Sequence, residues 1–246
     1  MITIVLPVSR TTFINQVMHS LESLNMEANL LVYVDDDLKA FEKWRNAVTR
    51  TQFKEKLCVF RKRGKTDEAN ILKRRARIGD IHREILALIK DSEYVFLTED
   101  DTIFPSNTLS VLKQNLNDLN AGFVSGVQIG RWGFPYVGAW KVNDLENPTF
   151  VESVKNTEGI VEVDTAGFYA CFMRREIYLS GVFDPYEDVL GPDFTFGLNL
   201  RRRGLRNYVN FDIKCGHLTP NKTITFENTK TSVVKFTKGE KWNIRF

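Results

Sequence analysis

Apolar runs with two different periods alternate along the first half of the sequence, and this alternation limits the possible folds more than any other feature. Short β-branched runs predict buried strands, and longer segments with apolar residues three or four positions apart predict helices. The predicted strands are 2–8, 29–37, 56–60, 93–98 and 121–129. The predicted helices are 11–24, 38–48, about 67–90 and 109–119, the last with Ser106 as its N-cap. This order indicates an α/β fold with a mostly parallel sheet covered by helices on both faces.

Two acidic triplets stand at the ends of predicted strands. Residues 35–37 are Asp-Asp-Asp and close the second strand, and residues 99–101 are Glu-Asp-Asp and close the fourth. Ligands of such sheets bind outside the carboxyl ends of the strands, so both triplets are expected at the ligand-binding edge. Adjacent carboxylates repel each other unless a cation lies among them, and oxygen-rich clusters suit Mg²⁺ or Mn²⁺. The alternative interpretation of each triplet is the acidic first turn of the following helix.

The predicted helix 67–90 combines an apolar stripe with a basic cluster. Arg74 and Arg77 lie near the stripe and are expected to point toward the strand ends, where an arginine fork suits a diphosphate. We interpret His82 as a surface or boundary residue rather than a ligand. The stripe consists of Ile71, Ile78, Ile81, Ile85 and Leu88.

The pattern changes after about residue 130. Residues 131–140 are rich in glycine and aromatic residues and predict a loop or irregular strands. A strand and a helix are expected over 163–181. A helix over 191–204 follows, with Asp193 in its first turn and Gly204 as its C-cap, and then a strand over 207–218 that leads to His217. The last 30 residues alternate polar and apolar positions and predict strands or an extended arm.

Composition is that of a globular protein with one sizeable core. The chain has 246 residues and a net charge of +3, which is too small to indicate nucleic-acid binding by itself. The three cysteines form no CxxC pair, so neither a zinc site nor a disulfide framework is indicated. Cys58 and Cys171 are interpreted as small core residues. With no apolar run of membrane-spanning length and no signal-peptide pattern, we expect a soluble, cytoplasmic protein.

Six segments carry a family resemblance. In chain order they are ITIVLPVSR, LLVYVDDD, YVFLTEDDTIFPSNTL, AGFYACFMRREIY, GPDFTFGLNLRRRG and KCGHL. This ordered set, which covers about residues 1–218, resembles the GT-A-fold glycosyltransferases, especially the family-2-like group. The resemblance implies a GT-A fold with a Rossmann-like nucleotide-sugar-binding half (1–130), an acceptor-binding half (131–218) and a C-terminal extension (219–246).

The resemblance also implies roles for single residues. The triplet 99–101 is similar to the DXD motif, which binds the diphosphate of a UDP- or GDP-sugar through Mn²⁺ or Mg²⁺; which of its acids ligate the metal stays open. Asp193 matches the acid that is often the catalytic base in inverting members, although Pro192 precedes it where the family has Glu. The implied metal ligands are Glu99, Asp101 and His217. Together with Arg77, the expected donor-site residues are Pro7, Val8, Ser9, Arg10, Asp35, Asp37 and Asp100.

The expected activity is metal-dependent transfer of a sugar from a nucleotide-diphosphate sugar to a hydroxyl of a saccharide, protein, lipid or modified base. Arg77 and Lys222 are expected to stabilise the leaving diphosphate, and Trp132, Phe134, Tyr136 and Trp140 offer ring faces to a sugar. One alternative is a sugar-1-phosphate nucleotidyltransferase, although the sequence has no glycine-rich phosphate loop after the first strand. The others are a non-catalytic nucleotide-sugar-binding domain and an enzyme whose nucleic-acid acceptor is bound by the basic clusters.

Overall fold

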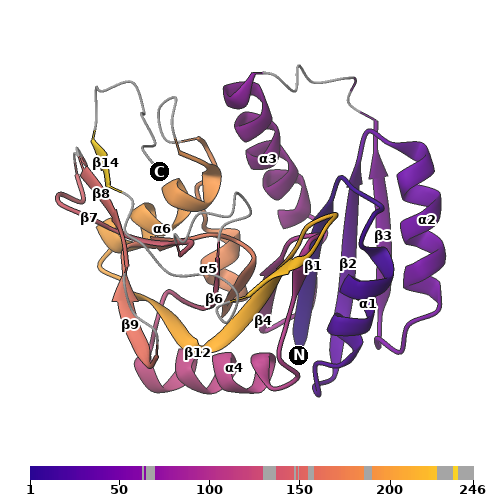
Figure 1. Cartoon of the computed structure of the whole chain (residues 1–246), viewed down its shortest axis with the longest axis horizontal. Helices are drawn as coiled ribbons and strands as arrows, with labels where there is room; N and C mark the ends of the chain where they lie inside the picture. Colours follow the sequence, from indigo (N-terminus) through magenta and orange to yellow (C-terminus); the bar gives the residue numbers. More distant parts are fainter. Residues whose placement is uncertain are drawn as a thin grey trace.

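The computed structural model of the chain describes residues 1–62, 64, 70–129, 137–146, 148, 150–154, 158–185, 190–225 and 235–237. Figure 1 shows a central sheet that crosses the molecule, with helices packed beside it. The strands of this sheet, in spatial order, are β13 (Thr223–Ile224), β12 (Asn207–Leu218), β6 (Phe123–Gln128), β11 (Ala170–Arg174), β4 (Tyr94–Thr98), β1 (Ile2–Val8), β2 (Ala28–Asp35) and β3 (Lys56–Arg61).

The sheet is mostly parallel, which confirms the predicted fold class. Strands β4, β1, β2 and β3 are parallel neighbours, and β6 is parallel to β12. Strand β11 lies antiparallel between β4 and β6, so the fifth predicted strand does not pair directly with the fourth. Two short strands, β5 (Thr102–Ile103) and β9 (Ile160–Val163), pair antiparallel with β12.

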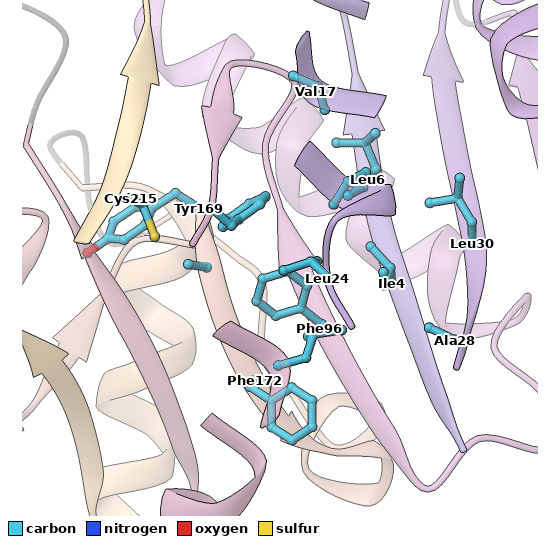
Figure 2. Packing of buried hydrophobic residues seen from close by; sticks show 14 of the residues in the cluster. Ile4, Leu6, Val17, Leu24, Ala28, Leu30, Phe96, Tyr169, Phe172 and Cys215 are labelled. Carbon is cyan, nitrogen blue, oxygen red and sulfur yellow. The ribbon is translucent and has the colours of Figure 1, made fainter. Parts of the chain in front are cut away.

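Helices cover both faces because side chains of the buried strands alternate between two hydrophobic clusters. In β1, Ile4 and Leu6 belong to one cluster and Val5 to the other. The first cluster includes residues of α1 (Ile14–Glu22), α2 (Leu38–Thr49) and α4 (Thr108–Leu119), and part of it is drawn in Figure 2. The second includes residues of α3 (Ile71–Leu86), α5 (Arg175–Leu179) and α6 (Pro192–Arg202).

Helix α3 differs from its prediction in length and in its buried face. It ends at Leu86 rather than near residue 90, and Asn70 caps its start by accepting from the amides of Leu72 and Lys73. Ile81 and Ile85 are buried as predicted, but Ile78 is 43% exposed. His82 takes part in the buried face, so its interpretation as a surface or boundary residue was wrong. Its ring stacks on Phe183, its Nδ1 lies 2.9 Å from the Tyr178 hydroxyl, and burial lowers its pKa to about 3.

The predicted helix ends are partly corrected. Helix α4 begins after Asn107, so the prediction that Ser106 is its N-cap was wrong. Thr108 instead closes the preceding turn, because its hydroxyl donates to the Pro105 carbonyl at 2.7 Å. Helix α6 ends at Arg202, with Arg203 as its C-cap and Gly204 directly beyond it in the left-handed region at φ +80°. This is the position where helices favour glycine.

A second, antiparallel sheet follows the change of pattern at residue 130. Its order is β10 (Thr165–Ala166), β7 (Ala139–Val142), β8 (Phe150–Ser153) and β14 (Lys235–Thr237). Strands therefore occur within the last 30 residues, as expected, at β13 and β14. Trp140 lies in β7, which agrees with the strand alternative for this residue, and its side chain packs beside Phe194 and Leu198 of α6 in a hydrophobic cluster. The other aromatic residues of the expected sugar-stacking loop, Trp132, Phe134 and Tyr136, lie outside the described residues.

The cysteines and the helices bear on the expectations drawn from composition. Cys171 is buried and Cys58 is partly buried beside the core, and all three cysteines are free thiols. Within the described ranges, no helix combines the length and apolar character that crossing a membrane requires. The cytoplasmic location stays a prediction.

Substitution of Gly79 by alanine is expected to destabilise the fold by about 1–3 kcal/mol, because a Cβ there would lie 2.1 Å from the backbone carbonyl oxygen of Phe183. Ala76, an exposed residue of the same helix, provides the control: Ala76→Gly should cost about 1 kcal/mol through helix propensity alone. Propensity alone would make Gly79→Ala stabilising. Urea denaturation measures both variants, and a more stable Gly79→Ala protein would contradict the close contact.

Candidate active site

The carboxyl ends of three neighbouring parallel strands, β1, β2 and β4, bring the predicted donor-site residues to one edge of the sheet. Ser9 and Arg10 follow β1, Asp35 ends β2, and residues 99–101 follow β4. The expected convergence of the strand ends is therefore observed. The side chain of Val8 belongs to the hydrophobic core, and Pro7 lies opposite Tyr33 in the pairing of β1 with β2. These two residues can therefore offer their backbone atoms to a ligand at this edge of the sheet.

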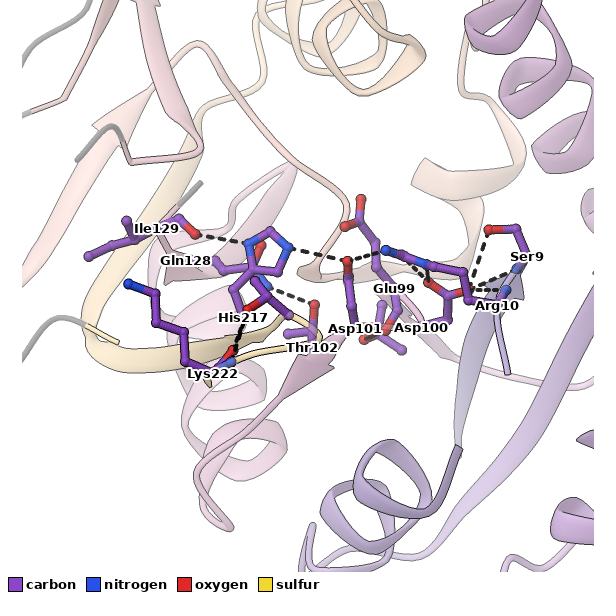
Figure 3. Close-up of polar contacts among 12 residues, drawn as sticks. Ser9, Arg10, Glu99, Asp100, Asp101, Thr102, Gln128, Ile129, His217 and Lys222 are labelled. Carbon is purple, nitrogen blue, oxygen red and sulfur yellow. Dashed lines mark hydrogen bonds and ion pairs between the residues drawn. The ribbon is translucent and has the colours of Figure 1, made fainter. Parts of the chain in front are cut away.

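The cation among the carboxylates of 99–101 is supplied by the chain itself. Arg10 donates from Nε to Asp100 Oδ1 at 2.9 Å, also pairs with Asp100 through Nη2, and reaches Asp101 Oδ2 from Nη1 at 2.7 Å (Figure 3). The backbone amides of Ser9 and Arg10 each donate to Asp100 Oδ2 at 2.8 Å. Asp100 thus holds the loop after β1. This is a structural contact beyond its predicted role in the donor site.

Arg10 neutralises only part of the negative charge of this cluster, because one guanidinium faces two carboxylates. Burial lowers the pKa of the Arg10 guanidinium, but the negative charges of Asp100 and Asp101 outweigh burial and raise the pKa overall. The Arg10 side chain is 34% exposed, whereas those of Asp100 and Asp101 are 4% and 1% exposed. Arg10 is therefore the more exposed partner of the two buried carboxylates. Its backbone is anchored separately, since the indole Nε1 of Trp44 donates to the Arg10 carbonyl at 2.8 Å.

Asp101 and His217 come together as predicted. Pairing of β5 with β12 places Thr102 opposite His217, and His217 Nε2 lies 3.2 Å from Asp101 Oδ2. The other ring nitrogen, Nδ1, lies 3.0 Å from the Ile129 carbonyl oxygen, which can only accept, so Nδ1 carries a proton. In a neutral imidazole the Nε2 lone pair then faces a carboxylate oxygen. Two acceptors in contact require a proton or a cation beside them, and the Arg10 guanidinium, 2.7 Å from the same Asp101 oxygen, is one such cation.

This arrangement fits a divalent cation. A metal-binding histidine commonly donates its second ring N–H to a backbone carbonyl, as His217 does to Ile129. Mg²⁺ and Mn²⁺ sites often use one or two protein ligands and complete their coordination with substrate phosphates. Among the described residues, no three His, Cys, Asp or Glu side chains form a ligand set, so Glu99 is not joined to the pair. A role for Glu99 as a metal ligand stays a prediction.

The triplet 35–37 is tied to its surroundings in three different ways. Asp35 forms an ion pair with Arg77, whose Nη1 also donates to the Gly64 carbonyl at 2.9 Å. Asp36 adopts the left-handed region at φ 61° and accepts from the Gly64 amide at 2.9 Å. Asp37 is the N-cap of α2, so the helix-start interpretation is confirmed for this residue. Contacts of Asp35, Asp37 and Arg77 with a donor stay predictions.

Replacing Asp37 by alanine should lower the free energy of unfolding by about 0.5–2 kcal/mol, because its carboxylate accepts from the Ala40 amide at 3.0 Å. Asp37→Asn should retain most of the stability, since asparagine also caps helices. Urea denaturation of both variants tests the cap. Equal stability of wild type and Asp37→Ala would contradict it. The KM for a donor in Asp37→Asn then shows separately whether the negative charge contributes to binding.

Asp193 lies in the first turn of α6, where Pro192 is the first helical residue. Burial raises the pKa of its carboxyl group, while the Phe194 amide and the charge of Arg75 act in the opposite direction. A Cβ on Gly191 would lie 2.4 Å from Asp193 Oδ1, so the glycine leaves room for this carboxylate. Sequence reasoning missed Arg75, although it lies in the basic cluster that drew attention to Arg74 and Arg77. Lys222 is exposed in the turn before β13, where its backbone bonds to Thr219.

Comparison with known proteins identifies the fold. No family model and no curated protein sequence matches the chain. A solved structure of GalNAc-T7 with UDP, GalNAc and Mn²⁺ is similar at a TM-score of 0.62 and 13% sequence identity, over 89% of this chain and 44% of that chain. The fold is therefore that of GT-A glycosyltransferases, as predicted, and the chain spans less than half the length of this neighbour. The likeness does not single out the family-2-like group.

Proposed function

We propose that this chain is a glycosyltransferase that moves a sugar from a nucleotide-diphosphate sugar to a hydroxyl acceptor and uses Mn²⁺ or Mg²⁺. The observation that carries the proposal is the buried Asp101–His217 contact at the carboxyl edge of β1 and β4 in a GT-A fold. The neighbour GalNAc-T7 was solved with UDP, GalNAc and Mn²⁺, which is consistent with this assignment. We assign residues 1–130 to donor binding, 131–218 to acceptor binding, and 219–246 to a C-terminal extension.

The residues of the site have separate tasks in this proposal. Asp101 and His217 hold the divalent cation, which when bound neutralises charge on the leaving diphosphate. Asp100 keeps the loop after β1 in place, and the guanidinium of Arg10 lies next to the same site. In an inverting reaction, Asp193 accepts the proton of the acceptor hydroxyl, because its carboxylate is basic for an aspartate and lies at the start of α6.

A thermal-shift screen of UDP- and GDP-sugars tests the proposal, since a ligand that binds the native state raises its stability. At a hundredfold excess over Kd, the gain is about 2.7 kcal/mol. For a chain of this size, that corresponds to an increase in Tm of about 5–10 °C. We expect the increase with a nucleotide sugar and Mn²⁺ together, and slow release of free sugar when the acceptor is absent. The absence of any shift across the panel would contradict donor binding.

The remaining alternatives give different results in the same assay. A non-catalytic binding domain shows the shift but releases no sugar during incubation with Mn²⁺. A nucleotidyltransferase instead forms pyrophosphate from a nucleoside triphosphate and a sugar-1-phosphate.

A further inference from the structure

Arg10 is the partly exposed partner of the two buried carboxylates of the site. Its guanidinium is within 2.9 Å of Asp100 Oδ1 and 2.7 Å of Asp101 Oδ2. Its side chain is about one-third exposed, whereas both carboxylates are almost fully buried. A cation that binds Asp101 therefore comes close to the positive charge of Arg10.

The arginine and an entering metal ion would compete for the same oxygen. Asp101 Oδ2 is the atom that contacts both Arg10 Nη1 and His217 Nε2. A divalent ion held between Asp101 and His217 would thus lie within a few ångströms of the guanidinium. Like charges at that distance in a partly buried site repel strongly. Metal binding at Asp101 consequently favours displacement of the Arg10 side chain.

The Arg10 side chain can leave without unfolding the loop that carries it. The backbone amides of Ser9 and Arg10 remain bonded to Asp100 Oδ2, and Trp44 holds the Arg10 carbonyl. Asp100 would still accept from two amides after the guanidinium departs, while Asp101 would become available to a metal ion. This asymmetry singles out Asp101, rather than Asp100, as the aspartate of the pair that exchanges partners.

We infer that Arg10 is a resident counterion of this site and that it exchanges Asp101 for the phosphates of the donor, which couples nucleotide binding to divalent-metal binding. This inference rests on the proposed function. An arginine fork pairs with phosphate oxygens as well as with carboxylates, so a diphosphate offers the displaced guanidinium an equivalent partner. Because coupling between two ligands is reciprocal, the nucleotide strengthens metal binding and the metal strengthens nucleotide binding.

Mn²⁺ titrations followed by the electron paramagnetic resonance signal of free Mn²⁺ test this without any turnover. The proteins are wild type, Arg10→Gln, Arg10→Lys and, as the control, Arg83→Gln. Arg83 also pairs with two carboxylates, Asp80 and Asp184, so its substitution removes the same charge elsewhere. Each protein is titrated alone, with UDP and with GDP.

We expect Arg10→Gln to bind Mn²⁺ alone at least about tenfold more tightly than wild type, a difference of about 1.4 kcal/mol. Either UDP or GDP should tighten Mn²⁺ binding by wild type at least about tenfold, and by Arg10→Gln much less. Arg10→Lys, which keeps the charge but loses the fork, should lie between them, and Arg83→Gln should match wild type. Thermal unfolding of each variant verifies that it is folded. If Arg10→Gln does not fold, the Mn²⁺ affinity of Arg10→Lys tests the inference in its place.

Two results would overturn the inference. One is Mn²⁺ affinity in folded Arg10→Gln, or Arg10→Lys, that is equal to or weaker than that of wild type. The other is an undiminished nucleotide effect in the Arg10 variants. Because the arm with Mn²⁺ alone contains no nucleotide, tighter binding by Arg10→Gln supports the counterion role even if the donor assays reject the glycosyltransferase proposal.

Discussion

Replacing Asp101 by asparagine is expected to lower kcat/KM for donor turnover about a hundredfold to a thousandfold, the usual effect of removing one electrostatic group from an active site. Asparagine keeps the size of the side chain but removes the charge that faces both His217 and Arg10. The variant should also lose Mn²⁺ affinity, since carboxylate oxygen is a much better ligand for this ion than an amide. Release of nucleotide diphosphate at saturating Mn²⁺ measures the first effect, and metal titration measures the second.

Asp118→Asn is the matched control, because Asp118 is an exposed aspartate on α4 and its loss should leave both quantities unchanged. The Asp101 variant also leaves Arg10 with one charged partner in place of two, so its thermal stability must be recorded alongside its activity. Wild-type turnover with unchanged dependence on Mn²⁺ in a folded Asp101→Asn protein would reject the metal site.

Local patterns were sufficient to predict the order of the longer strands and helices, whereas the short strands β5, β8 and β9 were not predicted. Strands β2 and β12 were predicted to within two residues at each end, because their apolar runs are long and bounded by acidic or turn residues. The position of β11 was not predictable in this way. Cys171 pairs with Leu97 on one side and Ser125 on the other, and such contacts between distant segments leave no periodic signal in any one of them.

The candidate site was predicted in location but not in its internal contacts. Strand direction alone places both acidic triplets at one edge of the sheet. The partner of each acid depends on residues far away in the chain: Arg10 lies 90 positions before Asp100, and Arg77 lies 42 positions after Asp35. His82 illustrates the same limit, because a single histidine looks alike in sequence whether it is exposed or stacked against buried aromatic rings.

Asp193→Asn is expected to lower kcat about a hundredfold to ten-thousandfold if Asp193 is the general base, and to make the protein more stable at neutral pH. The activity loss follows from removal of the proton acceptor. The stability gain follows from linkage: burial raises the pKa of Asp193 in the folded state above that in the unfolded chain. The folded state therefore binds the proton more tightly, and stability declines as pH rises through the folded-state pKa. Above that pKa the ionised carboxylate destabilises the fold, and asparagine removes this cost.

Two pH series measure these effects. Wild-type kcat should fall as pH is lowered through the raised pKa of Asp193, because the base becomes protonated, and this limb should be absent from the residual activity of Asp193→Asn. The difference in Tm between variant and wild type should be positive near neutral pH and should shrink as pH is lowered below both pKa values. Asp118→Asn corrects for the loss of one negative charge.

A variant that is both fully active and less stable than wild type at neutral pH would show that Asp193 is an ordinary helix-start residue. A stabilised but inactive variant is the combination expected of a partly buried catalytic carboxylate, since partial removal of a charge from water lowers stability while it makes the carboxylate more basic.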